Sequence, residues 1–278
     1  MIQNVPLFVN YLLAILIEIG MPVTLAILII KKFKVHWLVV VTGVLTFIGS
    51  QVVHIPLLQI PNLLQKAGLN IVLPSEWAIG WQALYLGLYA GLCEETARWV
   101  GYRALKSKAA SYRSAFGLGV GHGGVESVIV GVVVLASVLS AVLFNPTTAA
   151  AQGMSGEMVK LTTAKIAEFW SSPWHLPLAG AVERVTAVSA QLLMSVFVWK
   201  AVQKRSWLWY LLAVGYHALL DGTAVILTSL TSNYWVIEAV LAIFLVVDVI
   251  LLLLFWKKEK REELERIPAL TEQTISQK

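Results

Sequence analysis

Charged side chains and cysteine are both scarce in this sequence of 278 residues. Only 13% of the residues are Asp, Glu, Lys or Arg, against about 25% in an ordinary soluble domain. Hydrophobic residues make up 58% of the chain, which excludes a typical soluble globular protein. The one cysteine, Cys93, excludes an internal disulfide, and we expect it to be a small buried side chain.

Long apolar runs account for the high hydrophobic content. A run of about 20 apolar residues can cross a hydrocarbon core of about 30 Å. We therefore predict an all-α fold, a polytopic membrane helical bundle of about seven transmembrane helices over residues 1–256, followed by a charged cytoplasmic tail over residues 257–278. The predicted spans cover residues 7–30, 37–60, 81–103, 116–144, 174–199, 207–231 and 234–256.

The basic residues predict the orientation of the bundle. With the N-terminus outside, 16 of the 21 Lys and Arg residues fall in cytoplasmic segments, and the opposite orientation would invert this asymmetry. We therefore predict an N-out/C-in protein of the lipid bilayer. This also explains the sequence pI near 9.3 without a nucleic-acid partner. Two long outer connections, residues 61–80 and 145–173, contain apolar stretches that we expect to lie on the outer leaflet.

Ionisable residues inside the spans are the best candidates for chemistry, because each is costly in lipid and usually marks a site or pathway. Nine charged residues and two histidines qualify. They are Glu18, Glu94, Glu95, Arg98, Glu126, Glu183, Arg184, Asp221, Asp248, His122 and His217.

The third span contains Glu94, Glu95 and Arg98. Because residues 94 and 98 are one helical turn apart, Arg98 can neutralise Glu94, whereas Glu95 is rotated by about 100° and needs another partner. Two adjacent carboxylates in a low-dielectric setting do not both ionise cheaply, which suits a general acid or base. A salt bridge between helices is the simpler alternative, but it leaves the second glutamate unexplained.

The fourth and sixth spans each contain a histidine followed four residues later by an acid. His122 and Glu126 share one helical face, as do His217 and Asp221, which is the arrangement of two ligands or of a base and its orienting group. The glycines around His122 do not form a phosphate loop, because no Gly-Lys-Ser/Thr follows, and we expect them to allow close helix packing.

Depth makes these residues a more specific set. Counted at about 1.5 Å per residue from the cytoplasmic ends, six of them lie roughly 10–20 Å into the bilayer. Three helices can therefore present them at a common level, as in a polar chamber that opens toward the cytosol. The six are Glu94, Glu95, His122, Glu126, His217 and Asp221.

The motifs Glu94-Glu95-x-x-Arg98, His122-x-x-x-Glu126 and His217-x-x-x-Asp221 resemble those of the CAAX-protease and bacteriocin-processing superfamily of intramembrane peptidases, and most closely its YhfC-like branch. The resemblance implies that the span region is a peptidase-like domain in a bacterial plasma membrane. It also implies hydrolysis of membrane-associated protein or peptide substrates by a glutamate-activated water.

The motifs depart from those of the prenyl endopeptidases, which carry Glu-Glu-x-x-x-Arg, Phe-x-x-x-His and His-x-x-x-Asn. Here the first motif is one residue shorter, His122 takes the place of the Phe, and the other two motifs end in Glu126 and Asp221. This pattern is nearer to the PrsW-like branch. The roles of Glu94, Glu95 and His217 therefore carry over more directly than those of His122 and Glu126.

Hydrolysis of a peptide bond needs an activated water, a stabilised oxyanion and a protonated leaving amine. The resemblance assigns the general base to Glu94 or Glu95, with Arg98 holding the pair in place. It assigns the positioning of the water and the oxyanion to histidines, here His122 and His217.

Glu126 and Asp221 would orient the two histidines. The alternative chemistry within this class is a zinc site formed by His122, Glu126, His217 and Asp221, because imidazoles and carboxylates are adequate Zn²⁺ ligands. The zinc-protease signature His-Glu-x-x-His is absent, so the spacing alone does not favour zinc over a metal-free glutamic mechanism.

A second class of function also fits buried Glu, Asp and His residues, namely a proton-coupled secondary transporter that uses them as a relay. The sequence has no paired halves with matching interruptions, which weakens this alternative. A catalytically silent scaffold is a third alternative, but a scaffold has no need for so costly a set of buried groups.

Overall fold

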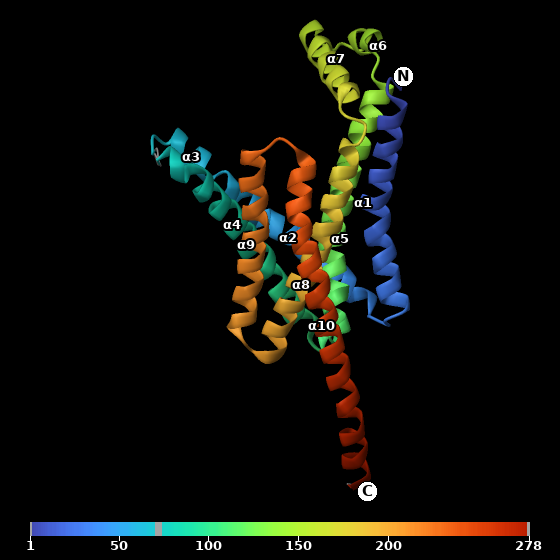
Figure 1. The fold of residues 1–278 in the computed structure, drawn as a ribbon, viewed down its shortest axis with the longest axis vertical. Helices are drawn as coiled ribbons and strands as arrows, with labels where there is room; N and C mark the ends of the chain where they lie inside the picture. The colour runs from blue at the N-terminus through green and yellow to red at the C-terminus, as the bar shows by residue number, and fades with distance from the viewer. Residues whose placement is uncertain (1, 70–73, 277–278) are drawn as a thin grey trace.

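The computed structural model of the chain describes residues 2–69 and 74–276, and in these residues the regular secondary structure is helical, without strands. Seven long helices form the bundle (Figure 1), and each corresponds to one predicted span. They are α1 (Val5–Lys31), α2 (Trp37–Leu58), α4 (Ser75–Leu105), α5 (Arg113–Leu143), α8 (Leu176–Lys204), α9 (Trp207–Leu230) and α10 (Tyr234–Ser276).

Six of these helices, all except α4, are long and apolar enough to cross a membrane, as judged over the described residues. α4 is 31 residues long, but it carries Glu94, Glu95 and Arg98, and its apolar content is lower. It packs against α2, α8 and α9, so its polar groups have protein neighbours. The fold is therefore the predicted polytopic helical bundle, with α4 as a seventh long helix beside the six candidate spans of the described residues.

Successive long helices run in opposite directions. The N-terminus lies at one end of the bundle with the short helices α6 (Pro146–Ala151) and α7 (Gly156–Ser171), whereas the C-terminus and the turn η1 (Lys106–Ala109) lie at the other (Figure 1). An odd number of long helices places the two termini on opposite sides, as the predicted N-out/C-in orientation requires. The orientation itself stays a prediction.

α8 is the central helix of the bundle. It packs against α1, α4, α5, α9 and α10, and it is buried on nearly all sides, although its sequence is less apolar than those of α1, α2 and α5. The outer helices instead expose leucine and isoleucine side chains along their length, which is the distribution expected of a protein surrounded by lipid.

Two close helix crossings position the centre of the bundle. At the crossing of α2 and α5, a Cβ atom added to Gly43 would lie 2.2 Å from the Leu118 carbonyl oxygen, and one added to Gly121 would lie 2.0 Å from that of Val40. At the crossing of α4 and α9, a Cβ atom on Gly91 would lie 2.9 Å from the Val214 carbonyl oxygen. Glycine is therefore required for these approaches, as expected for packing in lipid.

The two long outer connections are largely helical. The first contains α3 (Ile60–Lys66), and part of it, residues 70–73, lies outside the described residues. In the second, Trp170 of α7 is buried and donates to the Ala141 carbonyl oxygen at 3.3 Å, so α7 is attached to the end of α5. Met158 and Leu161 of α7 are exposed, and their place on the outer leaflet stays a prediction.

The predicted cytoplasmic tail is a direct continuation of the last span, because α10 runs without a break to Ser276. Residues 277 and 278 lie outside the described residues. Two ion pairs connect this extension to the bundle: Glu259 with the buried Lys200 of α8, and Glu263 with Arg113 of α5, at 3.1 Å between Nη2 and Oε2.

Candidate active site

The Glu-Glu motif lies at the centre of the bundle, on the part of α4 that follows the Gly91 crossing. Arg98 is fully buried and forms an ion pair with Glu95, whereas its Nη2 atom is 3.8 Å from Glu94 Oε2. The closer partner of Arg98 is thus Glu95 and not, as helical spacing suggested, Glu94. The difference arises because the Glu94 carboxylate turns toward histidines on neighbouring helices.

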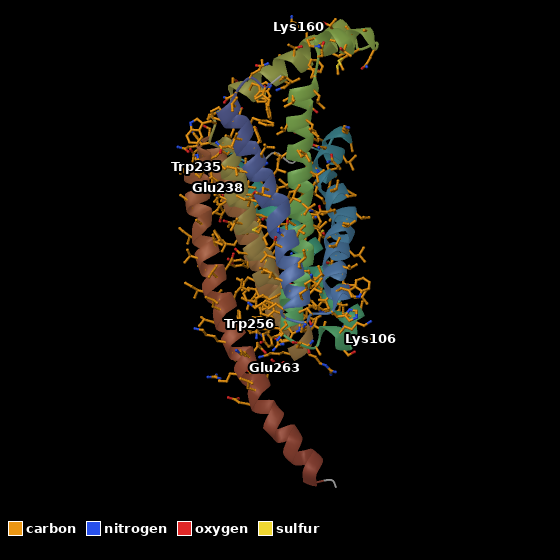
Figure 2. All side chains as sticks on the ribbon, turned by 90° about the vertical axis from the view of Figure 1, so that its right-hand side faces the viewer. Lys106, Lys160, Trp235, Glu238, Trp256 and Glu263 are labelled. Carbon is orange, nitrogen blue, oxygen red and sulfur yellow. The ribbon has the colours of Figure 1, made fainter. Side chains whose placement is uncertain are left out.

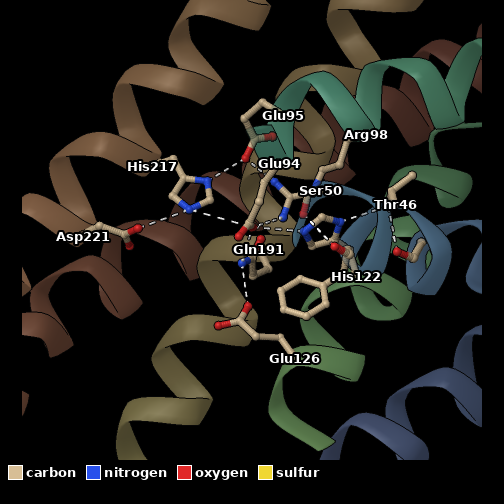
Figure 3. Close-up of polar contacts among 12 residues, drawn as sticks. Thr46, Ser50, Glu94, Glu95, Arg98, His122, Glu126, Gln191, His217 and Asp221 are labelled. Atoms are coloured by element: carbon tan, nitrogen blue, oxygen red, sulfur yellow. Dashed lines mark hydrogen bonds and ion pairs between the residues drawn. The ribbon is translucent and has the colours of Figure 1, made fainter. Parts of the chain in front are cut away.

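His122 of α5 faces Glu94, with 3.1 Å between its Nε2 atom and Glu94 Oε2 (Figure 3). The other ring nitrogen, Nδ1, is 3.0 Å from the Thr46 hydroxyl of α2. That hydroxyl donates its own proton to the Gly43 carbonyl oxygen at 2.7 Å, so it accepts from Nδ1–H. In the neutral imidazole, Nε2 is then an acceptor that faces a carboxylate oxygen.

His217 of α9 has the same arrangement. Its Nδ1 atom is 2.8 Å from Glu95 Oε1, a carboxylate that is also paired with Arg98, so Nδ1 carries the proton. Its Nε2 atom lies 3.4 Å from Asp221 Oδ2 and 3.9 Å from Glu94 Oε2 (Figure 3). Four acceptor atoms from α4, α5 and α9 therefore lie near one another, namely Glu94 Oε2, His122 Nε2, His217 Nε2 and Asp221 Oδ2. Because acceptors repel one another, such a group needs shared protons or a cation between its members.

This donor set fits a divalent metal ion in its chemistry. Two imidazoles present Nε2 while a hydroxyl or carboxylate holds Nδ1, which is the usual outer support of a metal-bound histidine. His217 Nε2 and Asp221 Oδ2 are 3.4 Å apart, close to the spacing of about 3.3 Å between two ligands of one zinc ion at about 2.0–2.1 Å. His122 Nε2 faces Glu94 Oε2 at 3.1 Å. Over residues 2–69 and 74–276, however, no group of three or more such side chains forms a ready-made metal site.

Glu126 does not join His122, although the two residues share a helical face. Its carboxylate contacts Arg184 Nη1 at 3.0 Å and Gln191 Nε2 at 2.8 Å, both from α8. Arg184 also pairs with its neighbour Glu183. Of the seven predicted site residues, Glu94 and five others therefore form one cluster, and Glu126 lies in a second polar cluster connected to it through Gln191.

Sequence reasoning missed several polar residues of the site because it considered ionisable side chains in the span interiors. Gln191 is buried and its Nε2 atom also lies 3.3 Å from Glu94 Oε2, and Gln51 of α2 reaches Glu94 Oε1 at 3.3 Å. Both amides donate to the same carboxylate. Glutamine in an otherwise apolar span was the available signal.

A cavity of about 300 Å³ adjoins these groups. Glu94, His217 and Asp221 line it, whereas Glu95 is fully buried behind them. His54 of α2 also lines the cavity, and neither of its ring nitrogens has a hydrogen-bond partner among the described residues.

The remaining predicted acids lie apart from Glu94. Asp248 of α10 is fully buried, pairs with Tyr216 and accepts from the Ser189 hydroxyl at 2.7 Å, so it joins α10 to α8 and α9. Glu18 of α1 is also buried, and its backbone oxygen accepts from Ser127 at 2.7 Å. The contact with Ser127 involves only the backbone of Glu18, and its carboxyl atom Oε2 is buried without a hydrogen-bond partner among the described residues.

Comparison with known proteins gives one family and one relative. Residues 13–241 match the family model described as YhfC intramembrane metalloprotease. The uncharacterized membrane protein YhfC of Bacillus subtilis (strain 168) is 24% identical over 242 residues, which cover 79% of this chain and 91% of that protein. No solved structure matches the chain significantly.

Proposed function

The chain belongs to the family of YhfC intramembrane metalloproteases, and from this premise we propose that it hydrolyses peptide bonds of membrane-associated proteins or peptides. One observation carries the proposal: acceptor atoms of Glu94, His122, His217 and Asp221 converge from three helices beside a cavity of about 300 Å³. A cavity of this volume lies at the lower end of the range of ligand pockets, and charged side chains such as Glu94 and Asp221 line it.

We assign the metal ion implied by the family to His122 and His217, through Nε2, and to Asp221. When bound, a divalent ion such as Zn²⁺ polarises a peptide carbonyl and makes water a stronger acid. Thr46 and Glu95 orient the two imidazoles by accepting from Nδ1, and Arg98 fixes the Glu95 carboxylate. Glu95 is thus a positioning residue and not a group that touches substrate.

Glu94 is the general base of the proposed reaction. Its carboxylate lines the cavity, so it can accept a proton from water there and return it to the leaving amine. The amides of Gln51 and Gln191 each donate to one of its oxygens at 3.3 Å, which fixes the carboxylate plane. A metal-free version of the mechanism uses the same base, with the two imidazoles, when protonated on both ring nitrogens, as donors through Nε2 to the oxyanion.

Gln191 also gives Glu126 a place in the proposed mechanism. The amide joins Glu94 to Glu126, and Arg184 holds the other side of the Glu126 carboxylate. We assign Glu126 and Arg184 to the support of Gln191. They act on catalysis through the orientation of Glu94 and do not contact the reacting atoms.

The experiment is cleavage of a library of membrane-spanning peptides by the purified full chain in liposomes, read by mass spectrometry. We expect products with the wild type and with Glu157→Gln, a control on the exposed helix α7, but none with Glu94→Gln. Products from Glu94→Gln at the wild-type rate, or no product from a folded wild type, would contradict the proposal. A proton flux driven by substrate in the same liposomes would favour the transporter alternative.

A further inference from the structure

A second cavity lies on the side of the bundle, away from the proposed active site. It is a groove of about 320 Å³ with α1 and α10 as its walls and α5 and α8 as its floor. Its lining is apolar apart from Arg113, with Leu28 on one wall, Leu253 on the other, and Val120 and Leu192 beneath. Leu28 and Leu253 are 45% and 55% exposed, so the groove opens to the surrounding lipid.

Aromatic rings close the end of the groove nearest the C-terminal extension. Trp256 of α10 packs edge-on against Phe33, Tyr112 and Phe116, with ring centroids 5.0–5.1 Å apart. Figure 2 shows Trp256 on α10 above Glu263, where the helix leaves the bundle. Tryptophan prefers the level of the lipid headgroups, so this end of the groove lies at a membrane surface.

The groove has a cationic rim at the same end. Arg113 is the first residue of α5, its side chain is 36% exposed, and one of its Nη atoms pairs with Glu263. The exposed lysines Lys31 and Lys32 immediately precede Phe33, which lines the groove. The rim therefore carries more positive than negative charge next to a wholly apolar interior.

We propose that this groove binds an anionic phospholipid, with an acyl chain along the groove and the phosphate at Arg113. The apolar body matches hydrocarbon, and the basic rim at headgroup level matches a negatively charged headgroup over a zwitterionic one. With the predicted N-out/C-in orientation, the lipid comes from the cytoplasmic leaflet. The site does not depend on the proposed peptidase activity.

Trp256 provides the readout, because it lines the groove. The full chain is reconstituted in phosphatidylcholine vesicles that contain increasing fractions of brominated phosphatidylglycerol or, in parallel, brominated phosphatidylcholine. The contribution of Trp256 is the fluorescence difference between the wild type and Trp256→Phe. We expect the anionic lipid to reach half-quenching at a fraction about fivefold lower than phosphatidylcholine does. This is the preference that one basic group near a membrane surface gives for an anionic lipid.

The variants separate the headgroup from the chain. Arg113→Gln should make the two quenching curves coincide, and Arg113→Lys should keep most of the preference. Leu28→Phe should fill the groove and weaken quenching by both lipids, whereas Leu12→Phe, at a residue of α1 that is also 45% exposed but outside the groove, should not. Equal quenching of the wild type by the two lipids would overturn the proposal, as would a preference that survives in Arg113→Gln.

Discussion

Glu94 and Glu95 are neighbours in the sequence but have different surroundings. A rotation of about 100° per residue turns their carboxylates to different sides of α4. Glu94 lines the cavity, whereas Glu95 is fully buried between Arg98 and His217. The sequence left open which of the two is the general base. Their surroundings support Glu94 as the proposed base and Glu95 as a positioning residue.

Glu94→Gln and Glu95→Gln should thus fail in different ways. We expect Glu94→Gln to lower kcat by about 10²–10⁴, the usual contribution of a general base, while bound zinc is retained. Glu95→Gln should weaken zinc binding by about 10–100-fold, because a neutral amide supports His217 Nδ1–H and pairs with Arg98 more weakly than the carboxylate does. Kinetics and zinc titration of both folded variants check this. If excess zinc restored the activity of Glu94→Gln but not that of Glu95→Gln, the roles of base and positioning residue would be reversed.

His54 should act on substrate binding. Its unpartnered ring nitrogens at the cavity wall can hydrogen-bond to a substrate peptide group. Loss of one such bond in His54→Ala should raise KM by roughly two- to tenfold, with a smaller effect on kcat. His54→Gln, which can still hydrogen-bond, should lie near the wild type. An unchanged KM in His54→Ala would remove His54 from the site.

The sequence predicts site residues only where an ionisable side chain lies inside an apolar span. Charge in an apolar span is rare, so the motifs of α4, α5 and α9 could be found. Contacts between helices could not be predicted, because they depend on the direction in which each side chain points. For this reason Glu126 was grouped with His122 instead of Arg184, and Gln191, which joins the two clusters, was missed.

At the scale of helices, glycine positions decide how closely the site residues approach. The α2–α5 crossing at Gly43 and Gly121 brings Thr46 to His122, and the α4–α9 crossing at Gly91 brings Glu95 to His217. The expected role of the glycines around His122 in close packing is consistent with these distances. Their partners on α2 could not be identified from the sequence.

Alanine substitutions in α2 test this role. Gly43→Ala places a Cβ atom 2.2 Å from the Leu118 carbonyl oxygen, whereas Gly49→Ala on the same helix has nothing within 4 Å. We expect Gly43→Ala to destabilise the protein by roughly 1–3 kcal/mol and to reduce activity, because His122 shifts. Gly49→Ala should be neutral or slightly stabilising. Equal melting temperatures of the two variants in detergent would show that the crossing has little effect.

At the scale of the whole molecule, the composition and the apolar runs were sufficient to predict a bundle of membrane helices. The seven predicted spans correspond to seven long helices, and the YhfC family predicted from the motifs is confirmed. The contacts of the α10 extension, such as the ion pair of Lys200 with Glu259, could not be predicted, because they join residues that are distant in the sequence. A cavity likewise depends on packing, so its lining could not be derived from the sequence.

The central claim is that His122 and His217 hold a metal ion beside Glu94 in an intramembrane peptidase. The most direct test is the cleavage rate of a membrane-spanning peptide as zinc is returned to chelated, folded protein, with bound zinc measured in the same samples. We predict a rate that rises in proportion to bound zinc and levels off at about one ion per chain. Full activity of the zinc-free protein would contradict the metal centre and favour the glutamic mechanism.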